Sequence, residues 1–195
     1  MKIVLLLLAA YFLGGIPWAY LIAKWTRGID IRQYGSGNVG FTNALRTIGK
    51  GPAVLVLIGD IGKGILAVLL AKYFGNPTIA TLSGLMVVVG HNYPLVLGFR
   101  GGKGAAAGFG ALLALLPFEA LLAVLVWGIT VFFTRYVSLG TILGAFTVPI
   151  ATLILQEDIN YIAFGVLGAA FVILKHHSNI SRLFKGTERK IGEKK

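Results

Sequence analysis

The sequence predicts an all-α integral membrane protein: a compact bundle of about seven transmembrane helices in one domain that covers residues 1–195. Of the residues, 56% are hydrophobic and only 13% are charged, which is far from the composition of a soluble protein. The mean hydropathy is +0.83. Apolar runs follow one another along the chain, and three polar, glycine-rich islands interrupt them.

The apolar runs cover residues 3–23, 53–73, 78–97, 103–116, 118–134, 139–155 and 159–174. A helix needs about 20 residues to cross a bilayer, and about 17 at the least. The first two runs meet this length, the fifth and sixth are marginal, and the fourth indicates a tilted or re-entrant segment. The first run follows Lys2 as in a signal sequence. It is too long and lacks a small-residue cleavage site, so we expect it to be retained.

The charges orient these spans. With an odd number of crossings, fifteen of the eighteen Lys and Arg residues fall on one side of the membrane. The opposite connections hold Glu119, Glu157 and Asp158, with Lys2 and Lys72 as their cations. Positively charged loops stay in the cytoplasm, so we expect the N-terminus outside and the C-terminus inside. All three islands then face the cytoplasm.

Two counts exclude whole classes of function. The chain has no cysteine, which excludes disulfides, thiolate metal sites and a cysteine nucleophile. The net charge of +11 is compatible with nucleic acid, but most cations flank apolar runs. Contact with anionic membrane lipid explains that pattern better, so we expect no nucleic-acid partner.

The first island covers residues 35–46 and contains a G-x-G-x-x-G pattern. No strand precedes it, so a dinucleotide fold is excluded. Glycines here allow a tight backbone whose N–H groups can face an anion, and Arg46 adds a planar fork suited to phosphate. A flexible loop with a helix cap is the alternative. Four further candidate side chains of this island are Ser36, Asn38, Thr42 and Asn43.

The second island covers residues 90–110, with a Gly-Gly-Lys-Gly turn at 101–104. It is not a Walker A motif, because Gly104 follows Lys103 where Ser or Thr belongs. Such a turn at a helix start offers N–H groups, a helix dipole and one ammonium, which together can hold a phosphate. Close helix packing through small residues is the alternative for 104–110. His91 fits a satisfied histidine at the membrane interface at least as well as a catalytic one.

The third island covers residues 175–191. His176 and Asn179 are three residues apart, so they share one face if the last helix continues. His176 and His177 are adjacent and make a poor metal pair, so we expect no metal site. Lys185–Lys195 fits a lipid-headgroup contact.

Within the second apolar run, Asp60 and Lys63 lie one helical turn apart. Ionisable groups at that depth are costly and often mark function. A neutralising pair, or a contact to a neighbouring helix, is the interpretation we favour.

The three islands read GSGNVGFTNALR, GHNYPLVLGFRGGKGAAAGFG and KHHSNISRLFKGTERK. Together, and over nearly the whole chain, they resemble the bacterial acyl-phosphate:glycerol-3-phosphate acyltransferases, the PlsY family. The resemblance implies transfer of a fatty acyl group from acyl phosphate to the 1-hydroxyl of sn-glycerol 3-phosphate, without a cofactor. It also implies residence in the bacterial inner membrane. The products would be lysophosphatidic acid, for phospholipid synthesis, and phosphate.

The expected catalytic residues are Ser36, Arg46 and Lys103, in contact with phosphate, and His176 and Asn179, which orient the acceptor or the transition state. The expected substrate-binding residues are Gly35, Gly37, Asn38, Thr42, Asn43, His91, Gly101, Gly102, Gly104 and Arg182. A His-x4-Asp pair is absent from the sequence, so a substrate phosphate oxygen is a candidate proton acceptor. A transporter of a phosphorylated small molecule and a lipid-binding scaffold remain the alternatives.

Overall fold

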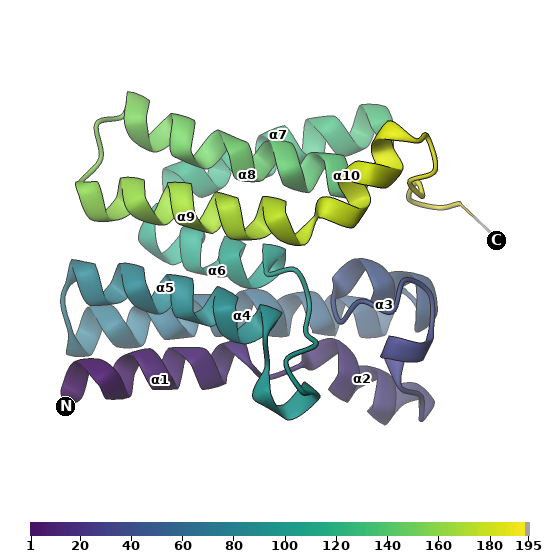
Figure 1. The fold of residues 1–195 in the computed structure, drawn as a ribbon, viewed down its shortest axis with the longest axis horizontal. Helices are drawn as coiled ribbons and strands as arrows, with labels where there is room; N and C mark the ends of the chain where they lie inside the picture. The colour runs from purple at the N-terminus through teal and green to yellow at the C-terminus, as the bar shows by residue number, and fades with distance from the viewer. Residues whose placement is uncertain (194–195) are drawn as a thin grey trace. The chain divides into compact units, whose positions relative to one another are not determined.

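The computed structural model describes residues 1–193, and every regular element among them is a helix (Figure 1). Each apolar run is largely helical, so the all-α prediction is confirmed. Contacts divide the chain into two compact units, Met1–Leu115 and Leu116–Lys195. The prediction of a single domain stays a prediction.

The first unit holds the first two islands. Its elements are α1 (Lys2–Gly14), α2 (Trp18–Arg27), η1 (Ile31–Gln33), α3 (Phe41–Thr47), α4 (Lys50–Phe74), α5 (Pro77–Asn92), η2 (Leu95–Leu97) and α6 (Ala105–Leu115). Three segments are long and apolar enough to cross a membrane: Lys2–Arg27, Lys50–Phe74 and Pro77–Leu97. The 11-residue α6 is shorter, as the fourth apolar run predicted.

The second unit contains α7 (Pro117–Thr134), α8 (Val137–Ile154), α9 (Ile159–Lys175) and α10 (His177–Phe184). Both α7 and α8 can cross a membrane by length and composition. The pair α9 and α10 bends by 60° and counts as a sixth candidate. The described residues therefore hold five or six candidate spans, and the predicted number of about seven is reached only if α6 crosses as well.

Glycines let the helices of the first unit approach each other closely. A Cβ added to Gly64 on α4 would overlap the Ala107 carbonyl of α6, and one added to Gly110 would overlap the Ile61 carbonyl. Between α1 and α5, Gly14 and Gly90 make equally close approaches. Close backbone approach through small residues is the usual way helices associate in lipid. The packing interpretation of residues 104–110 is therefore confirmed at Gly110.

The segment that leads into α3 is fixed by buried apolar side chains. Ile31, Val39 and Ala44 are almost fully buried, and they belong to a cluster that includes Ile48 and Val56. Burying these side chains holds a glycine-rich loop against α2 and α4 without regular backbone pairing. A cluster of buried apolar side chains therefore anchors the first island.

Close packing also joins the helices of the second unit. Gly144 of α8 faces the Ala123 carbonyl of α7, where an added Cβ would lie 2.8 Å away. Gly140 packs on Trp127 in the same way. Helix α9 then packs on α8. Short contacts of this kind align α7, α8 and α9 before the bend at His176.

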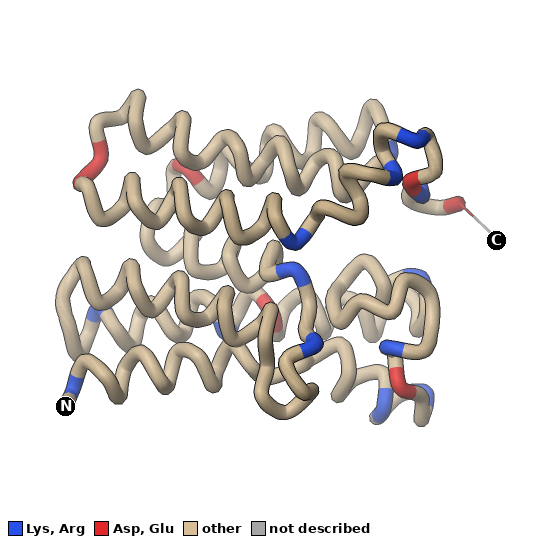
Figure 2. The backbone as a smooth tube through the Cα atoms, in the orientation of Figure 1, with Lys and Arg blue, Asp and Glu red and all other residues tan. Residues whose placement is uncertain are grey.

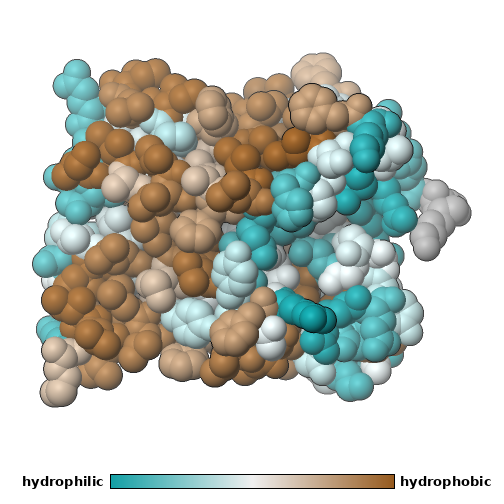
Figure 3. Space-filling model, viewed as in Figure 1, coloured by the Kyte–Doolittle hydropathy of each residue, from teal (hydrophilic) through white to brown (hydrophobic). Residues whose placement is uncertain are grey.

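Charge and hydropathy are distributed unevenly within each unit. In the first unit, Figure 2 shows most Lys and Arg positions at the end of the helices that carries α2 and α3. In the second unit, they gather at α10 and the segment after it, whereas the acidic α8–α9 connection lies at the other end. Figure 3 shows brown, apolar surface along the long helices and teal, polar surface over those charged ends. This distribution suits helices that cross a bilayer and carry most of their cations at one end of each unit.

Candidate functional site

Asn43 holds the first island in shape. Its Oδ1 accepts a hydrogen bond from the Ser36 N–H at 2.9 Å, and its Nδ2 donates to the Tyr34 carbonyl at 3.1 Å. The side chain is 1% exposed. Gly35 and Gly37 have φ angles of 63° and 70°, a region that favours glycine. Asn43, which the sequence predicted to bind substrate, therefore supports the loop from inside in this structure.

The other polar groups of the first island lie nearer the surface. Ser36 and Arg46 are exposed, and Asn38 and Thr42 are half-buried. The Ser36 Oγ accepts a weak hydrogen bond from the Asn38 N–H at 3.4 Å. The hydroxyl of Ser36 and the amide of Asn38 on the loop, with the guanidinium of Arg46 on α3, are suitable donors for a phosphate.

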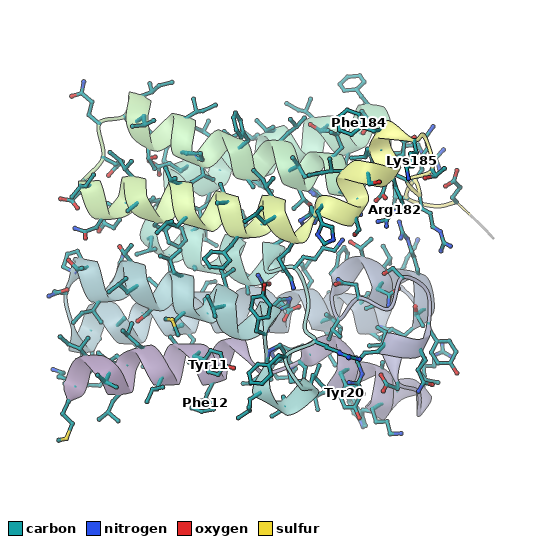
Figure 4. The ribbon with its side chains drawn as sticks, viewed as in Figure 1. Tyr11, Phe12, Tyr20, Arg182, Phe184 and Lys185 are labelled. Carbon is teal, nitrogen blue, oxygen red and sulfur yellow. The ribbon has the colours of Figure 1, made fainter. Side chains whose placement is uncertain are left out.

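Before this loop, Asp30 and Arg32 hold the chain in place after α2 through a helix cap and an ion pair. Asp30 caps η1 by accepting from the Arg32 N–H, and the two side chains form an ion pair at 2.7 Å. The hydrogen bond from the Arg32 side chain lowers the pKa of Asp30 below its ordinary value. The guanidinium also lies 5.4 Å from the ring centre of Tyr20, which Figure 4 labels on α2. Arg32 is thereby engaged locally and is a poor candidate for substrate.

The second island folds back on the end of α5. The Gly101 N–H donates to the Asn92 carbonyl at 3.2 Å, and the Gly102 N–H donates to the His91 carbonyl at 3.0 Å. The sequence predicted that the N–H groups of this turn face an anion. Two of them are instead hydrogen-bonded to backbone, which corrects that expectation for Gly101 and Gly102.

Lys103 follows directly and is half-buried. Gly104, with a φ of 80°, then turns the chain into α6, where the first backbone bond runs from Gly108 to Gly104. The N–H groups of the first turn of a helix have no partner within the helix, and the dipole there favours an anion. For the ammonium of Lys103 and the start of α6, phosphate binding stays a prediction.

The structure brings the first two islands into contact. A Cβ added to Gly102 would overlap the Nε2 atom of His91 and would lie 2.6 Å from the Val39 carbonyl. The same residues line a small cavity. His91 itself is 7% exposed, with its Nδ1 2.8 Å from the Lys63 Nζ. His91 is therefore a buried histidine with polar contacts, and its predicted role in substrate binding stays a prediction.

In the second unit, His176 lies at the bend between α9 and α10. The shared face of His176 and Asn179 was expected on the condition that the last helix continues, and the 60° bend between α9 and α10 shows that this condition is not met. The His176 Nδ1 lies 2.7 Å from the Val172 carbonyl. A carbonyl can only accept, so Nδ1 carries a proton, and in the neutral form of the ring Nε2 is the acceptor. His177 makes a similar contact to Leu174.

Glu188 organises the side chains around Asn179. Its Oε1 accepts from the Asn179 Nδ2 at 2.6 Å and from the Ser138 Oγ at 2.7 Å, and its Oε2 accepts from the Arg182 Nε at 2.6 Å. Burial raises the pKa of Glu188, but these hydrogen bonds outweigh it and leave the pKa below the ordinary value. Figure 4 labels Arg182 and Phe184 on α10 and Lys185 directly after it.

The sequence did not predict Ser138 or Glu188 as site residues. Glu188 carries a weak signal, since it is a lone carboxylate in a segment otherwise rich in cations. Ser138 carries none, because it sits at the start of an apolar run. Among residues 1–193, no three His, Cys, Asp or Glu side chains form a cluster that could hold a metal ion.

Comparisons with known proteins agree with these features. A family model of glycerol-3-phosphate acyltransferases matches residues 4–186. A glycerol-3-phosphate acyltransferase of Desulforamulus reducens is 54% identical over 98% of this chain and 96% of its own. Glycerol-3-phosphate acyltransferase 2 of Moorella thermoacetica is 46% identical over 97% of this chain and 98% of its own.

Crystal structures of PlsY (YgiH), an integral membrane glycerol 3-phosphate acyltransferase, have the same fold. The glycerol 3-phosphate form is 36% identical, with a TM-score of 0.94 over 98% of this chain and 96% of that chain. The lysophosphatidic acid form is 37% identical, with a TM-score of 0.91 and the same coverage. The chain is therefore an all-helical integral membrane protein of the acyltransferase class. It belongs to the glycerol-3-phosphate acyltransferase family, the PlsY family.

Proposed function

We propose that this chain transfers a fatty acyl group from acyl phosphate to the 1-hydroxyl of sn-glycerol 3-phosphate. The products are lysophosphatidic acid and inorganic phosphate. The observation that carries the proposal is the position of Lys103, directly before α6 on a turn that packs against the first island. The relatives named for glycerol 3-phosphate, and the solved form named for lysophosphatidic acid, support the same acceptor and product.

The chemistry needs little from the protein beyond positioning and charge. The hydroxyl oxygen attacks the acyl carbon, an ester bond forms, and the bond from that carbon to the phosphate oxygen breaks. The phosphate leaves with the electron pair, and a phosphate oxygen takes the hydroxyl proton. Holding both phosphates and aligning the hydroxyl lowers the barrier. Donors aimed at the developing negative charge lower it further.

The first unit supplies the cations for this scheme. Arg46 offers a planar fork that can bind two phosphate oxygens at once, and Lys103 offers a point charge. Ser36 adds a hydroxyl donor, and the N–H groups at the start of α6 add a backbone contribution. Gly104, Asn38 and Thr42 shape and line this part of the proposed site.

The second unit supplies groups that orient a hydroxyl. In its neutral form the His176 ring has an acceptor at Nε2, which can accept a hydrogen bond from the 1-hydroxyl. Glu188 fixes the Asn179 amide by accepting from Nδ2, which directs the Oδ1 atom away from the carboxylate. Arg182 is anchored to the same carboxylate and adds positive charge nearby. In this scheme, His176 and Asn179 position the acceptor, and no protein group acts as a strong base.

Transport of a phosphorylated molecule is the less supported alternative. Transporters bind their substrates near the bilayer midplane, and Asp60 and Lys63 are the charged pair within a long apolar helix here. The two side chains form an ion pair at 2.8 Å and are almost fully buried. The predicted neutralising pair is thus confirmed, and it leaves little reason to assign these charges to a substrate.

Purified protein in lipid vesicles tests the proposal. The vesicles receive labelled glycerol 3-phosphate together with acyl phosphate, acyl-CoA or acyl-carrier protein in separate samples. We expect labelled lipid in the sample that contains acyl phosphate and in neither of the other two samples. Label trapped unchanged inside the vesicles would favour a transporter, and label in lipid with acyl-CoA would contradict the proposed donor.

We also propose that the protein resides in the bacterial inner membrane with its N-terminus outside and its polar islands in the cytoplasm. The connecting segments on one side of the membrane hold most of the Lys and Arg residues, which supports this orientation. A reporter within residues 25–34 should be reachable from the cytoplasm alone. Labelling of that segment from outside would contradict the orientation.

A further inference from the structure

Three ionisable side chains meet inside the first unit. Asp60 and Lys63 of α4 are 1% and 4% exposed, and His91 of α5 is 7% exposed. The Lys63 Nζ lies 2.8 Å from the Asp60 Oδ1 and 2.8 Å from the His91 Nδ1. The His91 Nδ1 lies 3.4 Å from the same carboxylate oxygen. We call these three residues the buried triad.

The triad ties together parts of the chain that are distant in sequence. The Lys63 Nζ also donates to the Ile16 carbonyl at 2.9 Å, within the break between α1 and α2. Its ammonium thereby meets two acceptors and one ion-pair partner, which matches its three N–H groups. Lys63 therefore joins α4, α5 and the α1–α2 break at one point.

The opposite edge of the His91 ring faces the glycine turn. The Nδ1 atom of His91 faces the Lys63 Nζ, and Nε2 lies on the opposite edge of the ring. Nε2 lies against Gly102, where even a methyl group would overlap it. The same turn is bound to α5 through the carbonyls of His91 and Asn92. His91 thus contacts the turn with both its ring and its backbone.

We propose that the buried triad is a positioning device: it fixes the Gly101–Gly102 turn and thereby sets the place of Lys103, which follows that turn. The inference rests on the proposed function of Lys103. A buried ion pair is seldom retained for stability alone, because well-packed apolar residues of similar size are often as stable. In this proposal, Asp60, Lys63 and His91 act through the turn rather than by contact with substrate.

The double variant Asp60→Asn/Lys63→Met separates positioning from stability. It removes both charges together, so no unpaired charge stays buried, and the protein should keep a melting temperature close to that of the parent. A shift of about 1 Å in a site can cost about 100-fold in rate. We therefore expect kcat/KM to fall about 10- to 100-fold, chiefly through a higher KM for the phosphate-bearing substrates. Normal kinetics in the folded double variant would overturn the proposal.

Lys72→Met is the matched control. Lys72 is also on α4, and its Nζ also donates to a backbone carbonyl, that of Ala114 at 2.7 Å. This contact is remote from the glycine turn in the chain and is not shared with His91. We expect kinetics within about twofold of the parent for Lys72→Met, and a loss equal to that of the double variant would overturn the specific role of the triad.

A pair of His91 variants decides the question if the double variant does not fold. His91→Asn keeps an acceptor close to the position of Nδ1, whereas His91→Leu removes it, and both keep the Asp60–Lys63 ion pair. We expect His91→Asn to retain at least tenfold more kcat/KM than His91→Leu. Equal kinetics in the two variants would overturn the proposal. Both tests need an active parent enzyme, so an inactive parent would refute the proposed function instead.

Discussion

The two units build their candidate sites from different materials. In the first unit the backbone sets the geometry: glycines in the left-handed region, a turn bonded to the end of α5, and a helix start at α6. In the second unit one carboxylate, Glu188, sets it by accepting from three side chains. A site whose geometry is set by the backbone is sensitive to added side-chain volume. A group of side chains held by one carboxylate is sensitive to charge and pH. Each kind of change should therefore damage one unit more than the other.

Removing the charge of Lys103 should produce the largest effect. Lys103→Met keeps much of the stem but removes the charge-assisted contact to phosphate, and we expect turnover to fall about 100- to 1,000-fold. Lys24→Met, at an exposed lysine of α2, is the control and should stay near the parent rate. The measurement is steady-state turnover at saturating acyl phosphate. Turnover close to that of the parent would leave Lys103 with only a packing or lipid-contact role.

Added volume at Gly102 should produce the next largest effect. Gly102→Ala places a methyl group onto the His91 ring and toward the Val39 carbonyl. Overpacking of this kind costs about 1–3 kcal/mol, so we expect kcat/KM to fall about 10-fold or more. Gly62→Ala is the matched control, because a Cβ there meets no atom within 4 Å. Equal kinetics in both variants would show that the turn adapts freely.

Replacing His176 tests positioning in the second unit. His176→Gln keeps polar atoms near Nε2, and we expect about 10-fold loss of turnover, against about 100-fold for His176→Ala. A general base typically contributes about 10²- to 10⁴-fold. Turnover of both variants is compared with and without added imidazole. Equal, near-complete inactivation together with rescue by imidazole would favour a histidine base over the positioning scheme.

The smallest effect on chemistry, but the clearest effect of pH, should follow from Glu188. Glu188→Gln removes the charge that binds Arg182, and we expect it to lower the free energy of unfolding by about 1–3 kcal/mol. Hydrogen bonds hold the pKa of Glu188 below its ordinary value of 4.5. Its stabilising contribution is therefore present above pH 4.5 and is lost as the pH falls through the folded-state pKa.

Thermal unfolding between pH 3 and pH 7 measures this contribution. The parent should lose stability relative to Glu188→Gln as the pH falls, until the two converge. Glu193→Gln, at an exposed carboxylate, is the control and should follow the parent throughout. A constant difference between parent and Glu188→Gln across this range would contradict the role of the ionised carboxylate.

The sequence predicted the helices well and the connections between them less well. Each apolar run is largely helical because lipid requires internally satisfied backbone, so hydropathy alone locates such segments. Asp60 and Lys63 were predicted as a pair from their spacing, but their contacts to His91 and Ile16 join positions far apart in the chain. Local patterns carry no signal for such contacts.

Two local features also escaped prediction. A bend of 60° at His176 separates α9 from α10. No Gly or Pro marks this position, so the two helices look like one in the sequence. The N–H groups of Gly101 and Gly102 are used by α5 carbonyls, and a glycine-rich motif does not reveal which of its amides face a ligand. In both cases the motif named the residues, and only the tertiary contacts assigned their roles.

The central claim is the transfer of an acyl group from acyl phosphate to glycerol 3-phosphate. Phosphorus NMR of purified protein with both substrates measures this directly. The account predicts that acyl phosphate and glycerol 3-phosphate decline together, while lysophosphatidic acid and inorganic phosphate appear in equal amounts. Release of inorganic phosphate without lysophosphatidic acid, or no change in either substrate, would contradict it.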